Sequence, residues 1–192
     1  MYVRDAKNRE EVWLLDRIEE LGLDDTAFRS RDYVVAIDEV SNEKAGFGRI
    51  RIHRPDDGDP VCELTSIGVL EAWRDQGVGA HVVERLVDYA SDQGFERVYA
   101  LTSEGPYLAR FGFESIDVDS LPAVLQSRLE AKRDGVDPDA KPLRVAVDDF
   151  TVPDRLRDAF KAASKEEAAG DDETDPEEFG IDPETATYKY ET

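Results

Sequence analysis

A short glycine-containing segment, residues 74–80 (Arg-Asp-Gln-Gly-Val-Gly-Ala), has the spacing that most clearly suggests chemistry. Glycine lets a backbone approach a ligand closely, and the free N–H groups at the start of a helix attract anions. An apolar run precedes the segment and a helical pattern follows it, so we expect an anion site at the start of that helix. The Gly-Lys-Ser/Thr of a P-loop and the third glycine of a dinucleotide fingerprint are missing. A tight strand-to-helix turn without any ligand would show the same two glycines.

The elements that must position this segment follow from the apolar pattern. Helical spacing with glycine at its end predicts a first helix stopped by Gly22 and a second one, after the glycine segment, stopped by Gly94. Further helices are predicted near 106–111, 121–133 and 153–163, and strands at 33–37, 45–53, 61–69, 97–101, 113–116 and 142–147. Strands and helices alternate along the chain. We therefore expect one α/β (α+β) domain over residues 1–163, followed by an acidic, flexible tail over 164–192.

The charge is strongly acidic. The 192 residues include 45 acidic and 24 basic side chains, for a net charge of −21, which argues against binding to nucleic acid or to an anionic membrane. Residues 165–192 carry eleven acids and two lysines, a net of −9, so −12 remains for the rest of the chain. A surface acidic throughout is typical of proteins from halophiles, and an ordinary acidic protein with a disordered tail is the alternative.

Other features point to a cytoplasmic protein. The sequence has no apolar run long enough to span a bilayer and no secretory start, and Cys62 is its single cysteine. His53 and His81 have no second histidine or cysteine at ligand spacing, so we expect packing or surface roles for them and no metal site. The strand-like residues 185–190 could dock onto the domain or onto a partner.

Two motifs together resemble a known family. Residues 62–69, running into Arg74-x-x-Gly77-x-Gly79, resemble the acetyl-CoA motif of the GNAT superfamily of N-acetyltransferases, and residues 111–114 (Phe-Gly-Phe-Glu) resemble its later motif. The motifs stand in the family's order, and the resemblance covers roughly residues 2–150. It implies a mixed, mainly antiparallel sheet flanked by helices. The central strands of that sheet would splay apart, so that acetyl-CoA enters from one side and an amine from the other.

The resemblance also implies roles for main-chain groups. The pyrophosphate of the coenzyme would be held beside Arg74 by backbone N–H groups of Gln76, Gly77, Val78, Gly79 and Ala80. The pantetheine arm and the thioester carbonyl would be received by main-chain groups of Ile67, Gly68 and Val69. The missing side chain of Gly68 would permit close approach there.

Two side chains are candidates for proton transfer. Glu63 stands where members of the family that have a glutamate use it as general base, directly or through water, although an exposed strand glutamate would fit the pattern as well. The usual acid of the family is a tyrosine four residues before the glycine of the later motif, and Leu108 holds that place here. Tyr107, one position earlier, is the remaining candidate acid. Neighbours on a helix point about 100° apart, so we expect Tyr107 to be a packing residue unless the local turn is shifted.

The resemblance implies transfer of an acetyl group from acetyl-CoA to a primary amine. The chain after Phe113 is similar to the amino-acid-acetylating branch of the family, which favours an amino acid or other small metabolite over a protein terminus or lysine. The replaced tyrosine keeps open a non-catalytic acyl-CoA-binding module, and the acidic tail keeps open an adaptor for a basic partner. The sequence is compatible with a homodimer.

Overall fold

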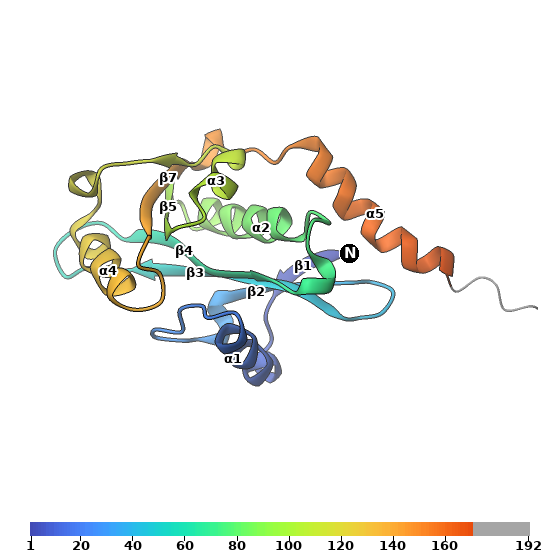
Figure 1. The fold of residues 1–192 in the computed structure, drawn as a ribbon. Coiled ribbons are helices and arrows are strands. Elements are labelled where there is room, and N and C mark those ends of the chain that lie inside the picture. Colours follow the sequence, from blue (N-terminus) through green and yellow to red (C-terminus); the bar gives the residue numbers. More distant parts are fainter. Residues whose placement is uncertain (171–192) are drawn as a thin grey trace, which may run out of the picture.

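A single seven-stranded sheet forms the centre of the molecule (Figure 1). The computed structural model describes the backbone of residues 1–170 and the side chains of residues 1–163. The strands lie in the order β1-β2-β3-β4-β5-β7-β6, and only the β4–β5 pair is parallel, so the mixed, mainly antiparallel sheet is confirmed. Their bounds are β1 Tyr2–Asp5, β2 Tyr33–Ile37, β3 Lys44–His53, β4 Val61–Val69, β5 Arg97–Thr102, β6 Glu114–Ser115 and β7 Lys141–Ala146.

Helices cover both faces of the sheet (Figure 1). Strand β2 shows why, because all five of its residues are buried and alternate residues serve opposite cores. Val34 and Ala36 join the main core under α2, while Tyr33, Val35 and Ile37 join a second core under α1. The helices are α1 Glu11–Glu20, α2 Val78–Asp92, α3 Gly105–Leu108, α4 Ala123–Asp134 and α5 Asp154–Gly170.

Helix α2 is the largest contributor of apolar contacts to the main core. Its buried face includes Val82, Val83, Leu86 and Val87, each 2% exposed or less. Burying side chains of this size is worth about 1.5–3 kcal/mol apiece, so the start of the helix is held firmly against the sheet. Glycines bound the helix, with Gly77 at a φ of +76° before it and Gly94 at +81° after it. The two predicted ends of this helix are therefore confirmed.

Strands β4 and β5 separate after a short contact. They pair only at Glu63 with Tyr99 and at Leu64 with Ala100. Just beyond, Ser66 has a φ of +50° and the register between β3 and β4 shifts, which marks a bulge in β4. On its other edge β5 stays paired with β7 along Arg97–Thr102, so the carboxyl ends of β4 and β5 separate while β5 remains in the sheet. This divergence creates the opening that the resemblance implied.

Some features differ from the sequence analysis. Strand β1 was not predicted, since its four residues are two apolar side chains followed by two charged ones, without alternation or a longer apolar run. Helix α5 continues to Gly170, past residue 163, and the strand-like residues 185–190 lie outside the described residues. Among the described residues, no helix is both long and apolar enough to cross a bilayer.

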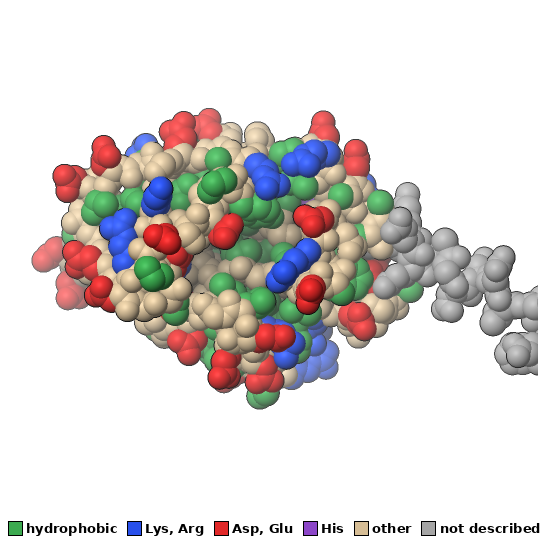
Figure 2. All heavy atoms as spheres, in the orientation of Figure 1, with side chains coloured by type: hydrophobic (Ala, Val, Ile, Leu, Met, Phe, Trp, Pro, Cys, Tyr) green, Lys and Arg blue, Asp and Glu red, His purple; other side chains and the backbone are tan. Residues whose placement is uncertain are grey.

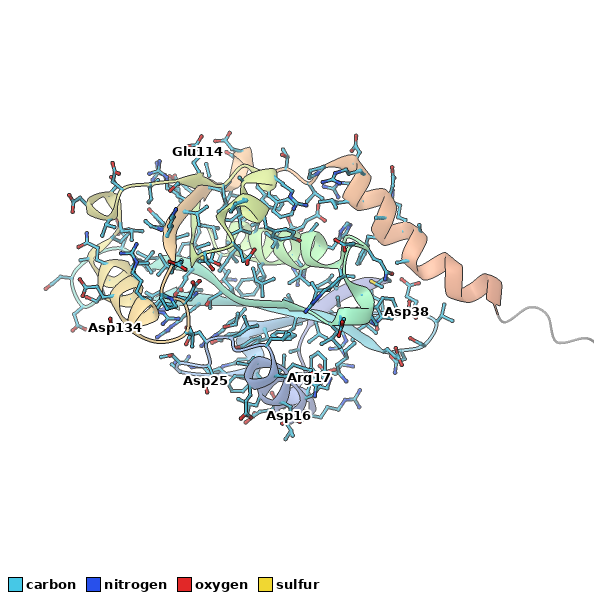
Figure 3. All side chains as sticks on the ribbon, viewed as in Figure 1. Asp16, Arg17, Asp25, Asp38, Glu114 and Asp134 are labelled. Atoms are coloured by element: carbon cyan, nitrogen blue, oxygen red, sulfur yellow. The ribbon has the colours of Figure 1, made fainter. Side chains whose placement is uncertain are left out.

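The acidic side chains are distributed over the surface. Figure 3 shows Asp16, Asp25, Glu114 and Asp134 pointing outward from four different parts of the ribbon. All four residues are exposed. The same face, drawn with all atoms in Figure 2, is hollowed near its centre, with acidic and basic side chains around the hollow.

Candidate active site

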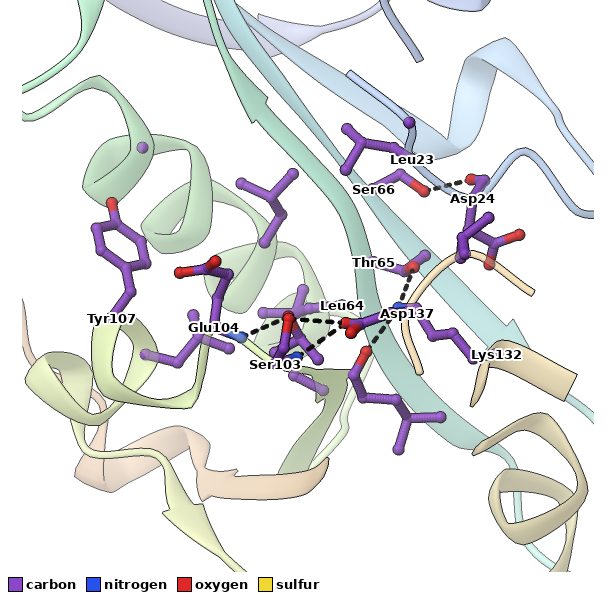
Figure 4. A pocket seen from close by; sticks show the side chains of 18 of the residues that line it. Leu23, Asp24, Leu64, Thr65, Ser66, Ser103, Glu104, Tyr107, Lys132 and Asp137 are labelled. Atoms are coloured by element: carbon purple, nitrogen blue, oxygen red, sulfur yellow. Dashed lines mark hydrogen bonds between the residues drawn. The ribbon is translucent and has the colours of Figure 1, made fainter. Parts of the chain in front are cut away.

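A cavity of about 370 Å³ lies between the separated ends of β4 and β5. One wall is the bulged part of β4, from Leu64 to Ile67, and the opposite wall is the end of β5 with α3 (Figure 4). The loop after α1 and the end of α4 close the remaining side, through Asp24 and Lys132. The cavity is therefore built by segments from the whole chain around one opening in the sheet.

A second cavity, of about 620 Å³, adjoins the first at the start of α2. Ile67, Gly79 and Tyr107 line both cavities, so they form one groove from the glycine segment to β4. Most of the predicted cofactor residues line this second cavity: Ile67, Gly68, Val69, Arg74, Gly77, Val78 and Gly79. The side chain of Gln76 turns away and donates to the carbonyl of Ala72, and Ala80 is buried in the main core.

The start of α2 suits an anion. The first N–H groups of a helix have no acceptor within the helix, and the helix dipole adds partial positive charge there. Three arginines, Arg74, Arg110 and Arg155, line the groove against two acids, Asp75 and Glu104. A local excess of cations in a chain of net charge −21 fits a phosphate-bearing ligand such as coenzyme A.

Two glycines of the groove have no room for a side chain. A Cβ on Gly77 would lie 2.2 Å from the carbonyl oxygen of Leu156 in α5, and Gly77 also has a positive φ. A Cβ on Gly79 would lie 2.5 Å from the Tyr107 hydroxyl. Gly77 is therefore required by the packing of this loop, and a side chain at position 79 would displace the Tyr107 hydroxyl.

Gly68 serves a different purpose from the expected one. A Cβ there would lie 2.7 Å from Cδ1 of Leu21 and 2.8 Å from Cζ of Phe47. The space that its missing side chain leaves is filled by the second core, on the α1 side of the sheet. We expected that space to admit the ligand; instead it lets β4 pack closely over Phe47.

Glu63 is fully buried, with 0% of its side chain exposed, and is not the exposed strand residue of the alternative interpretation. Its Oε2 lies 2.8 Å from Nε2 of His53 and 3.5 Å from Nε of Arg128. Thr65, two residues along the same face of β4, lines the cavity. The neighbour Cys62 points the other way into the main core, where burial raises the pKa of its thiol to about 12.

His53 was missed as a site residue. We expected a surface or packing role, but its ring is 9% exposed and bonded to Glu63. The β3–β4 hairpin gives the reason, because His53 pairs with Val61 and so stands diagonal to Glu63 on one face of the sheet. His81, by contrast, stacks on Phe160 with ring centroids 3.8 Å apart, so the packing role predicted for it is confirmed.

Helix α4 adds two cations that were also missed. Arg128 pairs with Asp24, and Lys132 donates to the carbonyl oxygen of Leu101 at 2.6 Å. Burial lowers the pKa of both side chains. The sequence signal was present, since residues 125, 128, 129 and 132 form one helical face on which two leucines alternate with two cations.

Tyr107 and Leu108 take different positions on the short helix α3. Leu108 is 4% exposed and belongs to the main core. Tyr107 packs edge-on against Phe111, with centroids 5.2 Å apart, and its hydroxyl faces Gly79 where the two cavities meet. Burial raises the pKa of Tyr107, and nearby Arg110 opposes the shift. The residue is thus both a packing residue and a hydroxyl inside the groove.

A splayed mixed sheet, with a glycine-bounded helix opening onto an anion-suited groove, fits the family that the two sequence motifs resemble. The sequence matches the model of the acetyltransferase (GNAT) family over residues 2–113. The chain therefore belongs to the acetyltransferase (GNAT) family. The motif resemblance at residues 62–79 and the splayed sheet agree with that membership.

Two curated relatives match shorter segments. An uncharacterized N-acetyltransferase of Chlorobaculum tepidum is 31% identical over 62 residues, or 32% of this chain and 40% of the relative. The amino-acid acetyltransferase of Mycobacterium tuberculosis is 36% identical over 55 residues, or 29% of this chain and 32% of the relative. The chain thus spans well under half of the length of each.

Solved structures share the fold over more of the chain. N-acetylglutamate synthase from Neisseria gonorrhoeae, complexed with coenzyme A and N-acetyl-glutamate, gives a TM-score of 0.60 at 19% identity, covering 76% of this chain and 34% of that one. Rv2747 from Mycobacterium tuberculosis, in complex with CoA, gives 0.61 at 18% identity, covering 76% and 99%. At these identities the likeness concerns the fold.

Proposed function

We propose that this acetyltransferase acetylates the primary amine of an amino acid or another small metabolite. Acetyl-CoA would supply the acetyl group as an activated thioester. The relatives support the proposal, since one is an amino-acid acetyltransferase and another was solved with N-acetyl-glutamate.

The observation that favours a small acceptor is the cover that the end of α4 forms on one side of the opening between β4 and β5. Lys132 at its end is bonded to Leu101, and Arg128 lies against Glu63. The cavity behind this cover, about 370 Å³, falls in the usual range of sites for small molecules. A peptide acceptor would need a longer open channel, so the cover favours a free metabolite over a protein terminus or lysine.

The groove residues would hold the coenzyme. Backbone N–H groups at the start of α2, from Gly77 to Gly79, would take the pyrophosphate, with the arginines of the groove adding charge. Main-chain groups of β4 from Ile67 to Val69 lie beyond its pairing with β5 and would receive the pantetheine arm. The N–H groups of the bulge would stabilise negative charge on the acetyl oxygen during transfer.

Glu63 would act as general base through a water molecule, because it is buried beside Thr65 and does not itself line the cavity. The hydrogen bond from His53 and the nearby Arg128 would fix the position of its carboxylate. Tyr107 would give a proton to the departing thiolate, since its hydroxyl stands where the two cavities meet and keeps its proton at neutral pH.

The test is release of free thiol from acetyl-CoA with a panel of amino acids and small amines. Turnover should be found for at least one acceptor, and Glu63→Gln should lower its kcat by about 10²–10⁴-fold while acetyl-CoA still binds. Glu114→Gln, on the exposed edge strand β6, is the matched control and should be neutral. Binding of acetyl-CoA without turnover on any amine would instead favour a non-catalytic acyl-CoA-binding module.

A further inference from the structure

Helix α4 places two cations on the face that it buries. Arg128 and Lys132 lie one turn apart and are 9% and 7% exposed. They alternate with Leu125 and Leu129, which fill an apolar cluster. Arginine and lysine are rarely buried unless something pairs with them, so the groups that contact these two side chains indicate the function of this helical face.

Arg128 has carboxylate partners within the protein. Its guanidinium pairs with Asp24, on the loop after α1, and its Nε lies 3.5 Å from Oε2 of Glu63. Glu63 is also bonded to His53. Asp24 and Oε2 of Glu63 are therefore already engaged, and within the described residues neither carboxylate forms an ion pair with Lys132.

Lys132 is held by neutral groups. Its Nζ donates to the carbonyl of Leu101 at 2.6 Å and lies 3.4 Å from Oγ1 of Thr65. Among the described residues, no carboxylate oxygen lies within 4.0 Å of this nitrogen. Asp137, five positions on, instead accepts bonds from the N–H and the hydroxyl of Ser103 at 2.8 and 3.2 Å.

The Lys132 ammonium also lines the cavity between β4 and β5 (Figure 4). An ammonium has three N–H donors, and a carbonyl and a hydroxyl take up two of them. Burial lowers the pKa of Lys132, opposed by the negative charge of Glu63, which shows that the charged form is held at a cost. An anion entering the cavity would offset that cost and engage the third donor.

We propose that Lys132 binds the carboxylate of the acceptor, so that the acceptors are amino acids, with the amino group close to a carboxylate. The proposal rests on the proposed acetylation of a small amine. Figure 4 places Lys132 and Tyr107 on opposite sides of the cavity, with Ser103 and Glu104 between them in this view and Ser66 on the Lys132 side. A carboxylate anchored at Lys132 would let the amino group extend along the cavity toward Tyr107, where the coenzyme groove joins it.

The test compares each amino acid with the amine that lacks its carboxylate. The native enzyme should have a kcat/KM about 100-fold or more higher for the amino acid, the range of a buried charge-assisted bond. Lys132→Met should remove most of this preference, change kcat/KM for the decarboxylated amine by less than about threefold, and leave the KM for acetyl-CoA unchanged. Lys132→Arg keeps the charge and should retain part of the preference.

A binding measurement separates this inference from the proposed function. With coenzyme A present, titration calorimetry should detect amino acids and also carboxylic acids that lack the amino group, and Lys132→Met should abolish both signals. If no amine is acetylated but this binding and its loss are seen, the proposed function fails and the carboxylate site stands. Equal use of both acceptors by the native enzyme, or an equal loss for both in Lys132→Met, would overturn the role of Lys132.

Discussion

The coenzyme groove and the acceptor end of the cavity meet at Tyr107, yet they are built from different chemical groups. Around the start of α2 the ligand would meet backbone N–H groups, two glycines and arginines that are exposed at the surface. At the end of α4 it would meet the buried charged side chains of Asp24 and Lys132, with Arg128 and Glu63 packed behind them. The coenzyme end would recognise its ligand through backbone groups, and the acceptor end through buried charged side chains.

This difference has physical consequences for each end. A backbone site does not titrate near neutral pH, but any added Cβ can destroy it. The affinity of a site built from buried charged side chains depends instead on whether those side chains are protonated. An added side chain should therefore impair mainly the coenzyme end, and a change of pH mainly the acceptor end.

The largest effect on coenzyme binding is expected at Gly77. Gly77→Ala should weaken acetyl-CoA binding by about 100-fold, because the Cβ would collide with the main chain of α5 in addition to the strain of a positive φ. Gly94→Ala is the matched control, since Gly94 has a similar φ of +81° with nothing within 4 Å of its added Cβ. Titration calorimetry with coenzyme A measures both. Equal affinities in the two variants would show that the loop is not the anion site.

Tyr107 sits on the border between the two ends. Tyr107→Phe removes only the hydroxyl and keeps the edge-on packing against Phe111, so kcat should fall about tenfold with acetyl-CoA affinity retained. Tyr99→Phe, on β5 outside this cavity, should leave kcat unchanged. An unchanged kcat in Tyr107→Phe would mean that solvent protonates the thiolate.

The acceptor end should respond to alkaline pH. Lys132 binds an anion only when charged, and its pKa is lowered from the ordinary value of a lysine, so the charge is lost as pH rises through that lowered value. The charged groups around it are Glu63 on β4, Arg128 on α4 and Asp137 after α4. The preference for amino acids over decarboxylated amines should fall about fivefold toward high pH. In Lys132→Arg this preference should not change with pH, because arginine keeps its proton. Parallel pH profiles in the native enzyme and in Lys132→Arg would contradict the role of Lys132.

The smallest effect is expected from α5. Arg155 is exposed in the coenzyme groove, so Arg155→Ala should raise the Kd for coenzyme A by about threefold at low salt, and less at high salt. Lys161→Ala removes an exposed cation of the same helix outside the groove and serves as the control. An equal loss in both variants would indicate a general effect of charge.

Local patterns were enough to predict much of the fold. Strand β4 and the two ends of α2 agree with the sequence analysis because apolar spacing and glycine act over a few residues. The groove around Gly77 and Gly79 was predictable for the same reason, once the family motif was recognised. Strand β1 escaped because four residues of mixed character carry too little pattern.

The acceptor end was harder to predict because its groups are far apart in the sequence. The packing of α4 against β4 brings together Asp24, Glu63 and Arg128, and no short-range sequence pattern connects these three residues. His53 could have been placed from the hairpin register, had the pairing with Val61 been assumed. The only sign of Lys132 in the sequence is its place as one of two cations on a helical face shared with two leucines.

The contact between Gly77 and α5 means that one wall of the coenzyme groove is synthesised after the sheet and α2. The main chain of Leu156 lies against Gly77, the His81 ring stacks on Phe160, and Arg157 pairs with Glu84 at 2.6 Å. A nascent chain would thus have its sheet and α2 in place before the last wall of the groove emerges from the ribosome. A chain cut before Asp154 would therefore fold around a groove that is open on one side.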